Sequence, residues 1–156
     1  MTPKSLLRLP EAKSPKEEFI NGSFREVIDD HTVIKKESIN RVLLTSGKAY
    51  YDLIKYRGDK GINNTAIVRI EQFYPYDSGQ IKEILNSYSN AKDIVWVQEE
   101  PKNMGAWPFL YTKLSEDIGK GQKLTYNGRP EGASPAVGSA KISTQQQKEI
   151  VEAAFK

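Results

Sequence analysis

Short apolar runs alternate with amphipathic helical patterns along most of this chain, and this alternation constrains the fold more than any other feature. Strands are predicted at Arg41–Thr45 (RVLLT), Thr65–Ile70 (TAIVRI), residues 93–97 (DIVWV) and residues 122–126. The segments VLL, AIV and IVWV are apolar on both faces of a strand, which is typical of a parallel sheet covered by helices on each side. We therefore predict a three-layer α/β fold, in which helices cover both faces of a mainly parallel sheet.

Apolar side chains at helical spacing predict one helix after each strand. The four stripes are Tyr50, Leu53 and Ile54; Ile81, Ile84, Leu85 and Tyr88; Trp107, Leu110, Tyr111, Leu114 and Ile118; and Gln147, Ile150, Val151, Ala154 and Phe155. The first helix should end near Gly58 to Gly61. Pro108 is compatible with the third helix only in its first turn, which places Gly105 and Ala106 at the helix entrance.

The first 40 residues differ from the rest of the chain because they are polar and contain Pro3, Pro10 and Pro15. A short helix is predicted at residues 15–20, before a stop at Asn21 and Gly22. We interpret residues 1–40 as an interdomain linker with an edge element. Residues 41–156 should form one α/β domain.

Composition excludes several classes of protein. The 156 residues include 23 basic and 20 acidic side chains, with a formal net charge of +3 and the signs interspersed, so nothing indicates nucleic-acid binding. The absence of cysteine excludes a disulfide, a thiol nucleophile and a thiolate metal site within this chain. No apolar run approaches the roughly 18 residues of a membrane span, and the N-terminus lacks a signal-peptide core. We expect a soluble protein with neither a membrane nor a metal site of its own.

Two adjacent carboxylates, Glu99 and Glu100, follow the third predicted strand and precede Pro101. Because side chains alternate along a strand, these two should point in roughly opposite directions, so at most one can face a given cleft. A carboxylate here could act as a general base, bind a cation or meet a basic group of a partner. It could also accept backbone hydrogen bonds or form an interface salt bridge. Pro101 should end the strand bonding and stiffen the turn.

Two basic residues are candidates for contact with an anion. Lys48 lies at a strand-to-helix turn (TSGK), but the glycine spacing of a phosphate loop is absent, so we predict an ordinary helix cap there. Arg129 lies in the stretch from Gly128 to Gly138, predicted as a loop that is functional or packed on another surface. Its guanidinium suits a bidentate clamp on a carboxylate, within this domain or across an interface.

The remaining residue types that carry chemistry suggest structural roles. His31 is the only histidine, and no nucleophile-elbow motif accompanies it, so we predict a solvated surface histidine. Without a cysteine or a second histidine, a free-standing hydrolase has little support. Trp96, Trp107, Tyr50 and Tyr51 are not flanked by a basic stripe and are predicted as core and interface aromatics.

Five stretches in order along the chain carry a family resemblance. They are TPKSLLR (2–8), VLLTSGKAYYDL (42–53), AIVRIEQFYPY (66–76), VWVQEEPKNMGAW (95–107) and GRPEGASPAVG (128–138). Together they resemble the C-terminal region of the thiamine-dependent first component of the 2-oxoglutarate dehydrogenase complex. The related 2-oxoadipate dehydrogenases share much of this pattern, so the resemblance leaves the substrate open between the two.

The resemblance implies a transketolase-like C-terminal domain of a longer homodimeric enzyme. In that family, thiamine diphosphate and magnesium bind between two upstream domains, whose motifs match no position here. The enzyme decarboxylates a 2-oxo acid and passes the acyl group to the lipoyl arm of the succinyltransferase component. The location implied is the cytoplasm of a bacterium or the mitochondrial matrix of a eukaryote. This chain is then expected to hold neither catalytic nor cofactor-binding residues.

We hypothesise that QEEPKNMGAW and GRPEGASPAVG are contact surfaces for the upstream domains and the second subunit. The interface or regulatory candidates are Glu99, Glu100, Asn103, Gly105, Trp107, Arg129, Ser134 and Lys48. The alternative is a regulatory module that holds an anionic nucleotide through Lys48, Arg129 and the helix entrance at Gly105.

Overall fold

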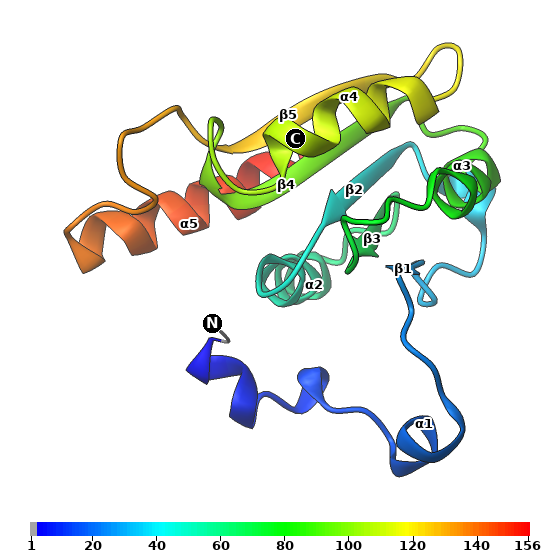
Figure 1. Ribbon diagram of the computed structural model, residues 1–156, viewed down its shortest axis with the longest axis horizontal. Helices are drawn as coiled ribbons and strands as arrows, with labels where there is room; N and C mark the ends of the chain where they lie inside the picture. Colours follow the sequence, from blue (N-terminus) through cyan, green and yellow to red (C-terminus); the bar gives the residue numbers. More distant parts are fainter. Residues whose placement is uncertain (1–2) are drawn as a thin grey trace.

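The computed structural model describes residues 3–156 and has a five-stranded sheet at its centre (Figure 1). The strand order is β1-β3-β2-β4-β5. The strands are β1 (Val27–Ile28), β2 (Arg41–Thr45), β3 (Thr65–Ile70), β4 (Asp93–Pro101) and β5 (Lys123–Arg129). Strands β2 to β5 run parallel, and β1 pairs with the edge of β3 in the antiparallel direction. The predicted, mainly parallel sheet is therefore confirmed.

Four helices cover the two faces of this sheet, which confirms the three-layer arrangement. They are α2 (Ala49–Lys60), α3 (Ser78–Ser87), α4 (Trp107–Asp117) and α5 (Ala140–Ala154). Helices α2 and α5 pack on one face, against side chains that include Leu43 and Val95. Helices α3 and α4 pack on the other face, against Leu44, Ile94 and Trp96. Neighbouring residues of one strand thus enter different cores, which explains why the strands are apolar throughout.

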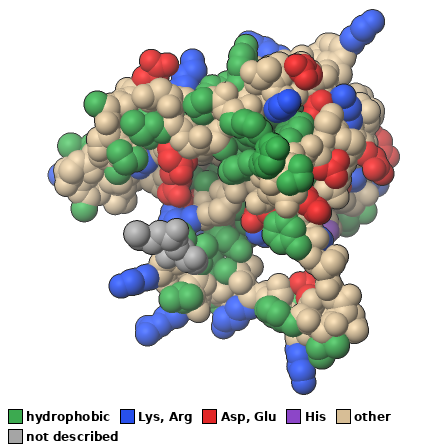
Figure 2. Space-filling model, in the orientation of Figure 1, with side chains coloured by type: hydrophobic (Ala, Val, Ile, Leu, Met, Phe, Trp, Pro, Cys, Tyr) green, Lys and Arg blue, Asp and Glu red, His purple; other side chains and the backbone are tan. Residues whose placement is uncertain are grey.

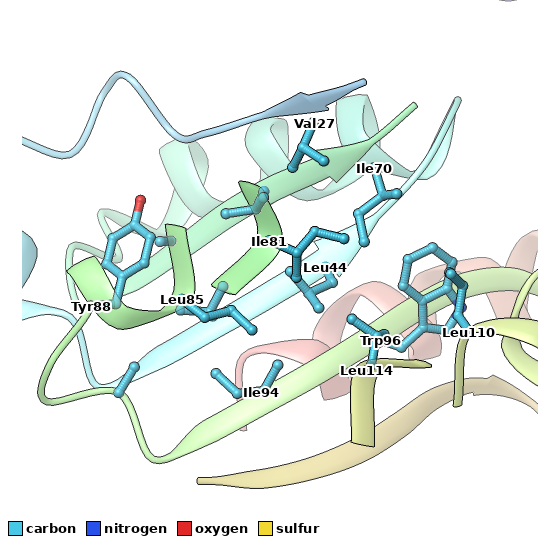
Figure 3. Packing of buried hydrophobic residues seen from close by; sticks show 14 of the residues in the cluster. Val27, Leu44, Ile70, Ile81, Leu85, Tyr88, Ile94, Trp96, Leu110 and Leu114 are labelled. Carbon is cyan, nitrogen blue, oxygen red and sulfur yellow. The ribbon is translucent and has the colours of Figure 1, made fainter. Parts of the chain in front are cut away.

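The core on the α3/α4 side contains the larger number of buried side chains. Figure 3 shows Ile81 and Leu85 of α3, and Leu110 and Leu114 of α4, among the side chains of this core. All four are at most 2% exposed. Full burial of such a side chain stabilises the fold by about 1.5–3 kcal/mol, so this core holds both helices on the sheet.

Strands β2 and β3 have the predicted bounds, whereas β4 and β5 are longer than predicted. The prediction ended them at residues 97 and 126, but they continue to Pro101 and Arg129. A register shift between Val97 and Pro101 separates the two parts of the ladder, and Pro101 then pairs with Arg129. The Lys102 N–H donates to the Arg129 carbonyl at 3.1 Å. Pro101 is tolerated because it lies at an irregularity of the ladder, where no backbone N–H donor is needed.

Helix boundaries follow the local signals in the sequence. Helix α2 ends at Lys60, within the predicted range, and is followed by the C-cap residue Gly61, which has a φ of 63° in the left-handed region. Helix α4 begins at Trp107 with Pro108 in its first turn, as predicted. Helix α5 is longer than its apolar stripe, because only Ile150, Val151 and Ala154 are buried. Its first turns therefore lie beyond the sheet.

The N-terminal segment runs along one side of the domain as an arm of short elements (Figure 1). They are η1 (Lys4–Arg8), η2 (Pro10–Ala12), α1 (Lys16–Asn21) and, after β1, η3 (Lys36–Ser38). Figure 2 shows basic side chains projecting from this arm. Asp30, just after β1, is buried and accepts hydrogen bonds from the Ile67 N–H at 2.8 Å and from the Arg57 guanidinium. His31 next to it is exposed, as predicted for a surface histidine.

Candidate functional site

The carboxyl ends of β2 and β4 flank a cleft of about 520 Å³. The chain leaves β2 toward β3 on one side, and it leaves β4 toward β5 on the other side. Such a switch point is where open α/β sheets place their binding crevices. The described residues that line this strand-end cleft are Pro3, Ser46, Gly47, Lys48, Ala49, Phe73, Tyr74, Trp96, Gln98, Glu99, Glu100, Gly105, Ala106 and Phe109.

Gln98 holds together the corner between β4 and α4. Its side chain is buried, and its Oε1 accepts hydrogen bonds from Trp96 Nε1 at 2.8 Å and from the Trp107 N–H at 3.1 Å. Its Nε2 donates to the carbonyl oxygens of Met104 at 2.8 Å and Pro101 at 3.1 Å. One amide thus satisfies buried polar groups before, within and after the turn, which fixes the path of the backbone.

Gly105 allows the turn to pass close to this amide. It has a φ of 66°, a conformation that favours glycine. A Cβ atom added there would lie 3.0 Å from Gln98 Nε2 and 3.1 Å from the Cβ of Glu100. The backbone conformation therefore favours glycine, and a larger side chain would also crowd Gln98 and Glu100.

Tyr126 and Asn103 connect this corner to the stretch that begins at Gly128. The Tyr126 hydroxyl donates to the carbonyl of Arg129 at 2.8 Å and lies 2.9 Å from that of Glu100. Burial raises the pKa of Tyr126 to about 12, so the hydroxyl remains a donor at neutral pH. The Asn103 side chain donates to the Gly132 carbonyl at 3.0 Å and accepts from the Gly132 N–H at 3.1 Å. The segments QEEPKNMGAW and GRPEGASPAVG, which both carry the family resemblance, therefore form one connected surface.

Lys48 is held by two carboxylates. Its Nζ lies 2.6 Å from Asp52 Oδ2 and 3.2 Å from Glu99 Oε1. Burial opposes the charge on Lys48, but hydrogen bonds and attraction from the two carboxylates outweigh it and raise its pKa. Lys48 is the N-cap residue of α2 but makes no side-chain cap bond, and the Thr45 hydroxyl donates instead to the Val97 carbonyl at 3.0 Å. The prediction of an ordinary side-chain cap at this turn is wrong, because these side chains bond to β4 and to α2.

Arg129 binds neutral acceptors within the described part of the chain, so the predicted carboxylate clamp inside this domain is wrong. Its guanidinium donates to the Glu99 carbonyl, to Gln146 Oε1 at 2.9 Å and, more weakly, to Ser143 Oγ at 3.4 Å. The prediction of a loop from Gly128 was also wrong, because Arg129 is the last residue of β5. From this position it ties β4 to the first turns of α5.

The adjacent glutamates have different surroundings. Glu99 pairs with Lys48, whereas the exposed Glu100 carboxylate makes neither an ion pair nor a hydrogen bond within residues 3–156. Both residues line the strand-end cleft, against the expectation that only one could. The physical reason is the register shift between Val97 and Pro101, which interrupts the regular alternation.

The other predicted residues lie around the cleft rather than in it. Trp107 is 7% exposed and packs against Tyr126. Ser134 is exposed and donates to the Ala136 carbonyl at 2.9 Å, away from the cleft. The sequence interpretation missed Gln98 and Tyr126. A glutamine that continues an apolar strand must find partners when it is buried, so Gln98 carried a usable signal.

Two further properties of residues 3–156 bear on function. No group of three or more His, Cys, Asp or Glu side chains in this part of the chain is placed to hold a metal ion. None of its helices combines the length and apolar character needed to cross a membrane.

Comparison with known proteins gives consistent matches over nearly the whole chain. Residues 13–155 match the family described as 2-oxoglutarate dehydrogenase C-terminal. The chain is 46% identical over 155 residues to the 2-oxoglutarate dehydrogenase E1 component of Cupriavidus necator, an alignment that covers 99% of this chain and 16% of the relative. The proteins of the same name from Haemophilus influenzae and Staphylococcus epidermidis are 44% and 38% identical, and the alignments cover 99% of this chain and 17% and 16% of the relatives.

This chain spans about one sixth of the length of the relatives that it matches. The family match, in contrast, covers almost all of the chain and includes both segments that form the corner. The chain therefore belongs to the 2-oxoglutarate dehydrogenase C-terminal family.

Proposed function

We propose that this chain is the C-terminal domain of a 2-oxoglutarate dehydrogenase E1 component and serves there as a contact domain rather than as a catalytic one. The family match and the names of the bacterial relatives support the enzyme context. The full enzyme would decarboxylate 2-oxoglutarate in the bacterial cytoplasm and transfer the succinyl group to the lipoyl arm of the succinyltransferase component.

Thiamine diphosphate and magnesium are assigned in this proposal to the upstream domains. The residues described here do not suit them, because no acidic or histidine cluster is placed for a metal ion and Lys48 is already paired with carboxylates. Arg129 likewise donates to partners inside the domain. The contacts of these two residues also argue against the nucleotide-binding alternative, which depended on both of them.

The main support for the contact role is the set of hydrogen bonds that connects the segments QEEPKNMGAW and GRPEGASPAVG. Gln98, Tyr126 and Asn103 link the β4–α4 corner to the end of β5 and the loop after it, while residues 133–139 of that loop stay exposed. A surface that is already ordered loses less conformational entropy when it binds a partner. The corner is therefore suited to hold the upstream domains and the second subunit of a homodimer in a fixed arrangement.

The test uses the full-length enzyme and the substitution Asn103→Ala. Loss of the two hydrogen bonds to Gly132 should loosen the loop after β5, weaken the dimer and lower activity in parallel with the loss of dimer. Asn86→Ala, at an exposed position of α3, is the matched control. Sedimentation, thermal unfolding and turnover are measured together. If Asn103→Ala and Trp107→Leu both behave like the control in all three measurements, the proposal fails.

A further inference from the structure

We infer that the strand-end cleft receives an arginine side chain from the domain that precedes this chain in the full enzyme. This inference rests on the proposed contact role and names the chemistry of the partner. It follows from the charge of the cleft, its aromatic walls and the position of Pro3.

The charge of the cleft favours a cation. The ammonium group of Lys48 contacts the carboxylates of Asp52 and Glu99, so its charge is more than balanced. Glu100 adds a third carboxylate at the rim, without a cationic partner in the described part of the chain. The net negative charge of this surface would repel an anionic ligand, whereas a basic side chain could bind to the Glu100 carboxylate.

The walls of the cleft favour arginine over lysine. Phe73, Tyr74 and Phe109 line it, and Tyr74 and Phe109 are 83% and 42% exposed. Large aromatic side chains left this open beside a carboxylate suit a planar guanidinium, which can stack on a ring and donate to the carboxylate together. Phe73 is fixed by its edge-to-face contact with Trp96, with ring centroids 6.1 Å apart.

The acidic wall is fixed before any partner arrives. The Glu100 carbonyl lies 3.3 Å from Gln98 Nε2 and 2.9 Å from the Tyr126 hydroxyl, so the backbone that carries the carboxylate is held from two sides. A Cβ atom added at Gly105 would lie 3.1 Å from the Cβ of Glu100, so the turn runs close to this side chain. A preorganised acceptor of this kind reduces the entropy lost on binding.

The position of Pro3 indicates the source of the arginine. Pro3 lines the cleft, so a domain joined to the N-terminal side of this chain would be tethered beside it. The relatives are about six times as long as this chain and have ample sequence for such a domain. Tethering raises the effective concentration of a side chain on that domain, so even a weak single contact would be occupied.

The first experiment tests the chemistry of the cleft on this chain itself. N-acetyl-arginine amide is titrated and followed by amide NMR, with N-acetyl-glutamine amide and ADP as comparison probes. We expect shifts at Gly105, Tyr74 and Phe109 for the arginine probe alone, and at least threefold weaker binding in Glu100→Gln. Glu83→Gln, exposed on α3, should bind like the parent. Equal shifts with the glutamine probe or with ADP, or an unchanged affinity in Glu100→Gln, would overturn the inference.

The second experiment separates this inference from the contact role in general. In the full-length enzyme, Glu100→Arg should weaken the packing of this domain against its neighbour, seen as at least fivefold faster protease cleavage within residues 3–24. If Asn103→Ala impairs the enzyme while Glu100→Arg matches Glu83→Arg, the contact role stands and the arginine pocket is wrong. If this chain alone forms a dimer that Glu100→Arg dissolves, the occupant is a second copy, and the assignment to the preceding domain is overturned.

Discussion

Replacement of Gln98 by glutamate tests whether one buried amide organises the corner. The substitution is nearly isosteric and keeps an acceptor for Trp96 Nε1 and for the Trp107 N–H. It replaces the Nε2 donor by an oxygen that faces the carbonyls of Met104 at 2.8 Å and Pro101 at 3.1 Å. Size and shape are conserved, so any loss of stability reports on the lost donor.

The magnitude follows from the Met104 carbonyl, which loses its donor, because the Pro101 carbonyl still accepts the Met104 N–H at 2.8 Å. A buried acceptor without a partner costs about 1–3 kcal/mol, so Gln98→Glu should lower the free energy of unfolding by about 1–3 kcal/mol at neutral pH. For a domain of this size each kcal/mol lowers Tm by about 2–4 °C, which gives a decrease of roughly 4–8 °C for a loss near 2 kcal/mol.

The pH dependence gives a sharper test. Burial among carbonyls raises the pKa of the introduced carboxyl group above its unfolded value, because the protonated form is neutral and can donate. A raised pKa in the folded state means that the variant is least impaired at low pH and loses stability as the pH rises through that pKa. The gap between parent and variant should therefore be wider at pH 8 than at pH 4.5.

The assay is urea unfolding of both proteins at the two pH values. Gln145→Glu, at an exposed position of α5, is the matched control and should change stability by only a few tenths of a kcal/mol through its neighbour Glu149. A loss below about 1 kcal/mol for Gln98→Glu at pH 8 would refute the role given to this amide, because even one orphaned carbonyl costs that much. An equal loss at both pH values would refute the electrostatic part of the reasoning.

Three further substitutions have defined outcomes in urea unfolding. Gly105→Ala should cost about 1–3 kcal/mol because of its positive φ and close neighbours, whereas Gly138→Ala, with open space around it, should change little. Asp30→Asn should cost about 3–5 kcal/mol because it breaks the buried pair with Arg57. Burial opposes the charge on Asp30, but its hydrogen bonds outweigh this effect and lower its pKa. The stability that Asp30 contributes is therefore present above the pKa of the unfolded state and is lost as the pH falls through the pKa of the folded state. Tyr126→Phe should cost about 1–2 kcal/mol, and an unchanged midpoint would show that its hydroxyl does not tie the corner to β5.

The strands β2 and β3 could be predicted to the residue because all their side chains except Arg41 and Arg69 are β-branched or aliphatic. The ends of β4 and β5 could not, since Pro101 predicts a stop and the pairing with Arg129 depends on a register shift between distant segments. Local patterns give the period of a strand but not an irregularity in its ladder.

The location of the candidate site could be predicted in outline, but the hydrogen bonds between its residues could not. The sequence placed Glu99, Lys48 and Gly105 each between the end of a strand and the start of a helix, and the structure brings all three to the strand-end cleft. Arg129 was expected to meet a carboxylate because its side chain chemistry favours one, yet its partners come from β4 and α5 and include a backbone carbonyl. Sequence separation hides such partners, because each is 14 or more residues away.

The two adjacent glutamates, equal in the sequence, should have separable effects. The pair between Glu99 and Lys48 is about one third exposed, so Glu99→Gln should cost at most about 1 kcal/mol of stability. That substitution leaves Glu100, and hence the affinity for an arginine probe, largely intact. Glu100→Gln should do the opposite: it removes no contact made within the described chain, so unfolding is unchanged while probe binding weakens. A double-mutant cycle of Glu99→Gln and Glu100→Gln, measured by urea unfolding and by probe affinity, tests whether the two glutamates act independently. Additive effects would support one carboxylate that stabilises the domain and one that faces a partner. Strong coupling in either readout would mean that both glutamates act on Lys48, and the cleft would then lack the free carboxylate that an arginine requires.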